Sequence, residues 1–87
     1  MMDLNNINEA VKKHVYHIGS EGKVPMHKHD SSDEIFYCIK GSGFGINEEG
    51  ETPLKVGDCF IAPAGTLHSL RSETDLYVCA FIVPVVE

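Results

Sequence analysis

The residues best suited to chemistry in this sequence are histidines. His27 and His29 are two positions apart, Glu34 follows His29 after a polar turn, and His68 comes just after the turn Pro63-Ala64-Gly65. On a strand, the first two imidazoles would point to one face, because successive side chains alternate between faces. A hairpin after His29 could bring the Glu34 carboxylate beside them. Imidazoles and a carboxylate together bind non-haem iron and related divalent metals, so these residues are candidate metal ligands.

Strands are the elements that must position these residues. Segments rich in Val, Ile, Phe, Tyr and Thr alternate with turns rich in Gly, Ser, Asp and Glu. Many short strands at close spacing are typical of an all-β sandwich or small barrel. Helical spacing occurs at Leu4, Ile7 and Val11, which predicts only a short helical turn at the N-terminus. The predicted strands are 11–18, 23–29, 34–40, 43–47, 52–55, 59–62, 66–72 and 76–83.

The spacing of these residues resembles the two motifs of the cupin superfamily. The first motif is matched by Gly22, His27, His29, Glu34 and Gly41, and the second by Gly57, Pro63, Gly65 and His68. Two positions depart from the family pattern: four residues, where the family has about five, separate Gly22 from His27, and Ser72 stands where Asn is usual. The resemblance implies an all-β, cupin-type double-stranded β-helix, or jelly-roll barrel. It implies a single domain over residues 1–87, with motif one at 22–41 and motif two at 57–72.

The resemblance also implies a cofactor. The metal ligands would be His27, His29, Glu34 and His68, pointing into the barrel and holding one divalent transition metal per chain. Four protein ligands leave one or two positions of an octahedral metal open to water, dioxygen or a small molecule. The donor set suits iron, manganese, nickel, cobalt, copper and zinc, and it does not select one of them.

Strand alternation predicts what surrounds the metal. Counting from an inward-pointing Glu34 and His68, the pocket lining is Phe36, Cys38, Thr66 and Leu70. This lining is mostly apolar and includes no Lys or Arg to hold a phosphate. It favours a small ligand that is largely apolar or weakly anionic. Cys38 is either an inert core thiol or a thiol beside the metal.

We therefore expect a metal-dependent enzyme. No separate general base stands out in the predicted pocket, which favours oxygenase-like chemistry over an isomerase that needs a positioned base. The alternative is a non-catalytic module that binds or senses a small ligand or a metal. Regulators of this superfamily usually carry a DNA-binding helical domain, which this sequence lacks. A barrel that serves only stability or assembly is the third hypothesis.

The composition bears on partners and location. Among 87 residues, 7 basic and 13 acidic side chains give a formal charge of −6, which argues against binding to nucleic acid. No apolar run approaches the ~20 residues of a membrane-spanning helix, and the N-terminus does not resemble a signal peptide, so the expected location is the cytoplasm. A domain of this size has a small core, and the apolar segment 77–86 with the N-terminal strand offers an interface. The expected partner is a second copy in a homodimer, with His14 and His17 at the surface or in that interface.

Overall fold

The structure is a computed structural model that describes residues 8–85. Its strands are β1 (Lys12–Ile18), β2 (Ser32–Lys40), β3 (Ser42–Asn47), β4 (Gly50–Lys55), β5 (Cys59–Ala62), β6 (His68–Ser72) and β7 (Leu76–Pro84). Residues 8–10 are helical, whereas Leu4 and Ile7, on which the expected helical turn was based, lie outside the described residues. No helix within residues 8–85 is long and apolar enough to cross a membrane.

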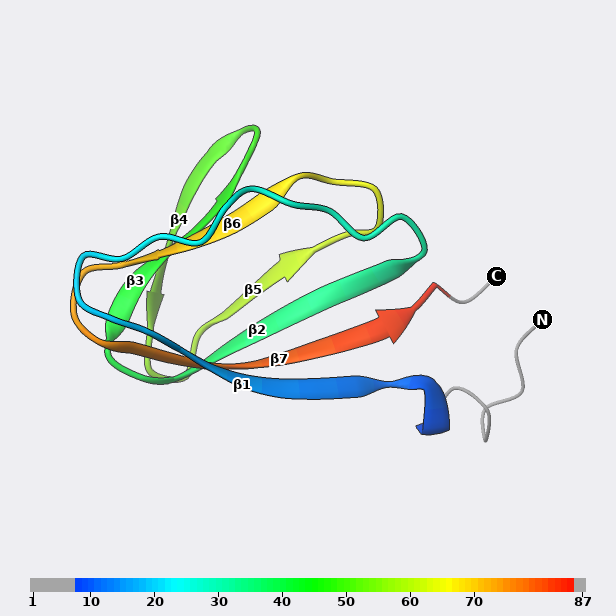
Figure 1. Cartoon of the computed structure of the whole chain (residues 1–87), viewed down its shortest axis with the longest axis horizontal. Coiled ribbons are helices and arrows are strands. Elements are labelled where there is room, and N and C mark those ends of the chain that lie inside the picture. The colour runs from blue at the N-terminus through cyan, green and yellow to red at the C-terminus, as the bar shows by residue number, and fades with distance from the viewer. Residues whose placement is uncertain (1–7, 86–87) are drawn as a thin grey trace.

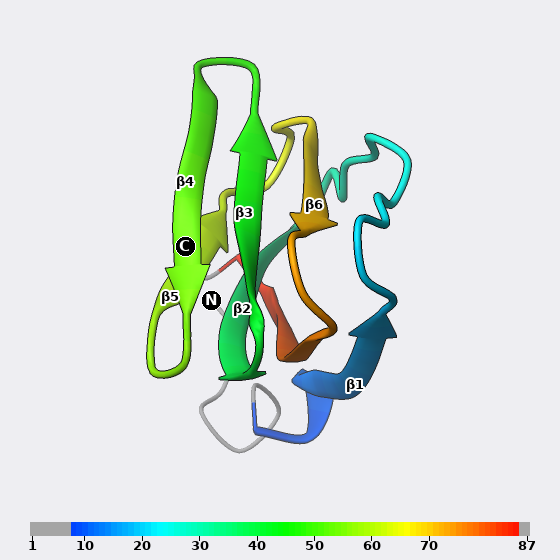
Figure 2. The same cartoon turned by 90° about the vertical axis from the view of Figure 1, so that its left-hand side faces the viewer.

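The strands form two antiparallel sheets that face each other (Figure 1). One sheet has the order β1-β7-β2-β5 and the other the order β4-β3-β6, so neighbours in a sheet are often distant in sequence. Figure 2 shows β3 between β4 and β6, with β2 and β7 passing behind them. The predicted all-β jelly-roll architecture is confirmed.

The core lies between the two sheets and follows the alternation of the strands. In β2 the buried side chains are Glu34, Phe36 and Cys38, and the residues between them are more exposed. The hydrophobic core consists of Ile18, Phe36, Cys38, Leu54, Phe60, Ala62, Leu70, Leu76, Val78 and Ala80. Each sheet contributes its inward-facing residues, as expected when one face of each strand is buried.

One predicted strand is wrong. Residues 23–29 form only two isolated bridges, Lys23 with Arg71 and His27 with His68. The reason is Pro25, which lies between the two bridges and has no N–H to donate to a neighbouring strand. The predicted strand 66–72 is also too long, since β6 begins at His68.

Glycines allow the two sheets and their connections to approach closely. Gly41 has a φ of +83°, and a Cβ there would overlap the backbone carbonyl of Asp75. Gly45 in β3 lies against Phe60 of β5, and a Cβ at Gly45 would overlap that buried ring. Gly41 and Gly45 therefore allow the backbone to lie close to Asp75 and to the Phe60 ring, respectively.

Replacing Gly45 tests this packing. We expect Gly45→Ala to lower the free energy of unfolding by about 1–3 kcal/mol, because the added methyl group must displace a core aromatic ring. The matched control is Gly19→Ala, where a Cβ meets nothing within 4 Å; its effect should stay within about 0.5 kcal/mol. Chemical denaturation measures both changes, and equal stability of the two variants would contradict the close approach.

Candidate metal centre

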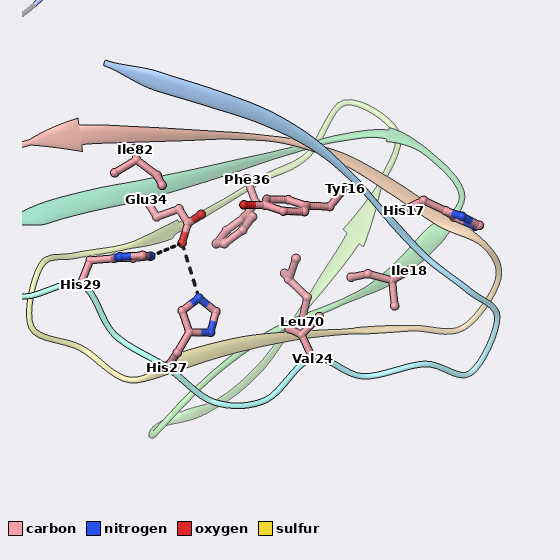
Figure 3. Close-up of a pocket in the computed structure, with 10 residues that line it drawn as sticks. All are labelled: Tyr16, His17, Ile18, Val24, His27, His29, Glu34, Phe36, Leu70 and Ile82. Atoms are coloured by element: carbon pink, nitrogen blue, oxygen red, sulfur yellow. Dashed lines mark hydrogen bonds and ion pairs between the residues drawn. The ribbon is translucent and has the colours of Figure 1, made fainter. Parts of the chain in front are cut away.

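Three histidines converge on one oxygen of a buried carboxylate. Glu34, on the inward face of β2, is only 2% exposed. Its Oε1 lies 3.0 Å from Nε2 of His68, 3.1 Å from Nε2 of His29 and 3.8 Å from Nε2 of His27. Figure 3 shows the last two imidazoles, both from the segment between β1 and β2, pointing at the carboxylate. The structure thus brings together the four residues that the sequence analysis singled out as candidate ligands, with their ligand atoms within 4.8 Å of one another.

Backbone pairing brings the histidines together. The N–H of His68 donates to the carbonyl of His27 at 2.8 Å, and the N–H of His27 donates to the carbonyl of His68 at 2.9 Å. The carbonyl of His29 accepts from the N–H of Gly65 at 2.8 Å, in the turn that precedes β6. Asp33, beside Glu34, accepts from the N–H of Ala64 at 2.8 Å in the same turn. The turn 63–65 therefore links both histidine segments to β2.

The other ring nitrogens fix the orientation of two imidazoles. Nδ1 of His27 lies 3.0 Å from the carbonyl of Pro25, and Nδ1 of His68 lies 3.0 Å from the carbonyl of Thr66. A carbonyl oxygen only accepts, so each Nδ1 must donate its proton. In the neutral imidazole this leaves an Nε2 lone pair directed at the centre, which is the arrangement of metal-binding histidines. The side chains present fit a divalent cation.

An apolar cavity lies beside this cluster. It has a volume of about 240 Å³, and Figure 3 shows its lining side chains. The lining residues are Tyr16, His17, Ile18, Val24, His27, His29, Glu34, Phe36, Leu70 and Ile82. A cavity of this size is smaller than the roughly 300–1,000 Å³ typical of sites for drug-sized ligands, so it suits a small molecule.

Two of the predicted lining residues, Phe36 and Leu70, do line the cavity, whereas Cys38 and Thr66 do not. Cys38 points inward as expected, but it lies further along β2, fully buried, with Sγ 3.7 Å from the carbonyl of Lys40. Burial raises the pKa of the Cys38 thiol, and the negative charge of Asp58 adds to the increase. Thr66 precedes β6, and its hydroxyl donates to the carbonyl of Pro63 at 2.6 Å. Its contribution to the site is the carbonyl that orients His68.

Sequence reasoning missed the lining residues contributed by β1. Tyr16 and Ile18 share a face of β1, but only the pairing of β1 with β7 brings that face over the cavity. His17 also lines the cavity, although its ring stacks on Tyr77 with centroids 4.4 Å apart and its Nε2 lies 3.2 Å from Asp75. The alternation of side chains along a strand could have indicated that Tyr16 and Ile18 point to the same face. The pairing partner of β1 was not available from local sequence.

The two departures from the expected motif pattern lie next to each other. The N–H of Gly22 donates to the hydroxyl of Ser72 at 2.9 Å, and the N–H of Ser72 donates to the carbonyl of Gly22 at 2.9 Å. The Ser72 hydroxyl in turn donates to the carbonyl of Gly19. The shorter spacing and the serine therefore meet in one turn at the end of β6, away from the ligand cluster.

Two facing antiparallel sheets with a cluster of three histidines and one carboxylate between them define the cupin class of β-proteins. The chain belongs to this family: the profile described as "Cupin domain" matches residues 14–84. Among curated relatives, the chain is 34% identical over 62 residues to the "Oxalate-binding protein" of Thermotoga maritima, which covers 69% of this chain and 51% of that protein. It is 38% identical over 53 residues to "Germin-like protein subfamily 3 member 4" of Arabidopsis thaliana, covering 55% and 25% of the two chains. The chain spans about half or less of the length of these curated relatives.

Solved structures support the same fold. A predicted oxalate decarboxylase from Thermotoga maritima superposes with a TM-score of 0.82 at 24% identity, covering 98% of this chain and 76% of that one. The protein TT1209 from Thermus thermophilus superposes with a TM-score of 0.75 at 23% identity, covering 97% and 96% of the two chains. At these identities the likeness establishes the fold and not the activity.

The placement of Cys38 predicts how the thiols react. Alkylation requires the thiolate, and Cys38 is buried with a raised pKa, whereas Cys59 is exposed. At mildly alkaline pH we expect iodoacetamide to modify Cys59 faster than Cys38, and Cys38 only after denaturation, as followed by mass spectrometry of peptides. Modification of Cys38 in the folded protein as fast as of Cys59 would mean that Cys38 is reachable from the solvent.

Proposed function

We propose that this chain is a metal-dependent cupin that holds one divalent transition metal between His27, His29, Glu34 and His68. The convergence of three Nε2 atoms on Glu34 Oε1 is the observation that carries the proposal. The carboxylate of Glu34 and the imidazole of His68 are both buried, and burying such polar groups is unfavourable without compensating partners. In the tautomer set by their Nδ1 contacts, His27 and His68 direct lone pairs at a carboxylate oxygen that carries lone pairs of its own. A cation between these atoms turns that repulsion into attraction.

The chain's own residues determine what such a centre can accept. When bound, a divalent metal with this donor set supplies a Lewis-acid or redox centre with open coordination positions. The cavity beside the cluster is walled by Ile18, Val24, Phe36, Leu70 and Ile82, and neither Lys nor Arg lines it. These walls provide an apolar surface beside the centre, which is open to solvent at His27, and they leave room for a small ligand that is largely apolar or weakly anionic.

The reaction class that we favour is oxidation or oxygenation of that ligand. Reactions that need a positioned general base require a second titratable side chain facing the reacting atoms. Glu34 belongs to the ligand cluster, and the imidazole of His17 is turned toward Asp75 and Tyr77, away from the cluster (Figure 3). The remaining titratable lining side chain, Tyr16, is a phenol, which in its ordinary neutral form serves as a hydrogen-bond donor. The surroundings therefore favour chemistry that depends on the metal and not on a separate base. The three free cysteines are in keeping with the reducing cytoplasm, where we place the protein.

A second candidate is a non-catalytic module that binds a small ligand or a metal. The name of the Thermotoga maritima relative, an oxalate-binding protein, favours this alternative, because it describes binding and no reaction. The same site would serve it, since a carboxylate ligand could occupy the open coordination positions without turnover.

Metal content tests the proposed centre. We expect protein purified without chelator to contain about one transition metal per chain, and His68→Ala and His27→Ala to lose it, because each change removes a ligand. His17→Ala is the matched control, since this histidine lines the same cavity outside the cluster. Elemental analysis gives the result. Full metal content in the two ligand variants, or none in the wild type after reconstitution, would contradict the proposal.

Oxygen consumption by the same preparations separates the two candidates. Metal-dependent oxygen uptake with a member of a panel of small carboxylates, lost in His68→Ala, would support the enzyme. Saturable thermal stabilisation by such a compound without uptake or product would support the binding module.

We further propose that the chain forms a homodimer through the outer face of the sheet β1-β7-β2-β5. This outer face carries Val15, Ile35, Tyr37, Ile61, Cys79 and Phe81. Cross-strand pairs make it continuous: Phe81 is opposite Ile35, which is opposite Ile61 on the other side. Val15 and Ile61 are 67% and 58% exposed. Such a patch suits a self-complementary interface, because a second copy presents the same apolar residues.

Sedimentation tests the dimer. We expect the wild type to sediment as a dimer at micromolar concentration and Ile61→Lys to sediment as a monomer, because it would bury an unpaired charge within the contact. Val56→Lys is the control: Val56 is 64% exposed but lies in the turn between β4 and β5, outside that face. A monomeric wild type, or a dimeric Ile61→Lys, would count against this interface.

A further inference from the structure

Tyr16 places a hydroxyl group in the cavity beside the proposed metal centre. It is opposite Val78, which is fully buried, so the register assigns Tyr16 to the inward face of its sheet. Its side chain is nevertheless 42% exposed, because β1 is an edge strand beside the open end of the cavity. Figure 3 shows the phenol ring extending along the cavity, above Leu70, with its hydroxyl directed toward Glu34.

The hydroxyl of Tyr16 stands out because its surroundings are apolar. Beyond the ligand cluster, the other lining residues are aliphatic or phenyl side chains, with the exception of His17. The Nε2 of His17 faces Asp75 outside the cavity, and its ring is held against Tyr77. Among the lining residues, Tyr16 is therefore the side chain outside the cluster that can direct a hydrogen-bond donor at a molecule in the cavity.

The charge near the site indicates the sign of that molecule. A divalent metal with one carboxylate and three neutral imidazoles carries a net positive charge, so its open positions favour an anion. Lys12 is opposite Ile82, which on its other side is opposite Glu34, so the register places a further positive charge on the same face of this sheet as the cluster. A small carboxylate satisfies both observations, with its anionic oxygens at the centre and the rest of the molecule against the apolar walls.

We propose that the Tyr16 hydroxyl donates a hydrogen bond to an oxygen atom of a small carboxylate bound at the cluster. Tyr16 is then a ligand-binding and specificity-determining residue, which selects ligands with an oxygen acceptor over purely apolar ones. This inference rests on the proposed metal centre, and it names the ligand class and the residue that recognises it. A hydrogen bond to a charged acceptor is among the stronger ones in proteins. Its loss should weaken binding about tenfold or more.

Titration calorimetry on the metal-loaded full chain tests the proposal. The protein is first loaded with cobalt and its cobalt content is measured, and then oxalate, glycolate and acetate are titrated separately. We expect Tyr16→Phe to retain its cobalt and its melting temperature, and to bind at least one of the three carboxylates about tenfold more weakly than the wild type. The variant keeps the ring and removes only the donor.

Tyr37→Phe is the matched control. Tyr37 is 41% exposed, almost the same as Tyr16, but it lies on the outer face of the same sheet, in the proposed dimer interface, where Tyr37→Phe keeps the contacting ring. It should bind every probe as the wild type does. Equal affinity of Tyr16→Phe and the wild type would overturn the role of Tyr16 and leave the metal centre intact. Failure of the cobalt-loaded wild type to bind any of the three probes would overturn the ligand class, and a wild type that takes up no cobalt would overturn the centre on which the inference rests.

Discussion

The buried carboxylate of Glu34 is the constraint on which the rest of the site depends. An ionised group between two apolar sheets is stable only if opposite charge or hydrogen-bond donors surround it. Here the imidazoles that would hold a cation beside it come from β6 and from the segment before β2, which are joined by the backbone pair of His27 and His68. The geometry of the cluster therefore depends on the register of the strands. A shift of β6 by one residue would turn the side chain of His68 away from Glu34.

The connecting segments contribute atoms that are not side chains. The carbonyls of Pro25 and Thr66 hold the Nδ1 atoms of two histidines, and the turn 63–65 donates N–H groups to His29 and Asp33. Pro25 prevents residues 23–29 from forming a continuous strand. The backbone of this segment therefore pairs with β6 only at isolated positions, one of which is His27 with His68. The apolar walls next to the cluster lower the local dielectric constant, which strengthens each of these polar contacts.

The properties that depend on local spacing could be predicted from the sequence. The all-β architecture follows from the distribution of strand-forming and turn residues, and the positions of His27, His29, Glu34 and His68 identified a cluster that the structure assembles. Alternation predicted that Cys38 points inward, but alternation specifies a face and not a position along the strand. Cys38 consequently lies in the core beyond the cavity. The contributions of β1 could not be predicted in this way, because Tyr16 and Ile18 line the cavity only through the register of β1 with β7, and no local pattern encodes that register.

The candidate metal ligands and the cavity-lining residues of β1 differ in how strongly the core constrains them. The four candidate metal ligands lie on segments that pair on more than one side or are fixed by turns, so changes there disturb the core. Strand β1 pairs only with β7 among the described strands, and its side chains line the open end of the cavity. Substitutions on an edge strand affect few buried contacts, so the ligand preference proposed for Tyr16 could change at little cost to the cluster. A fold arranged in this way would keep the proposed metal centre while the molecule bound beside it varies.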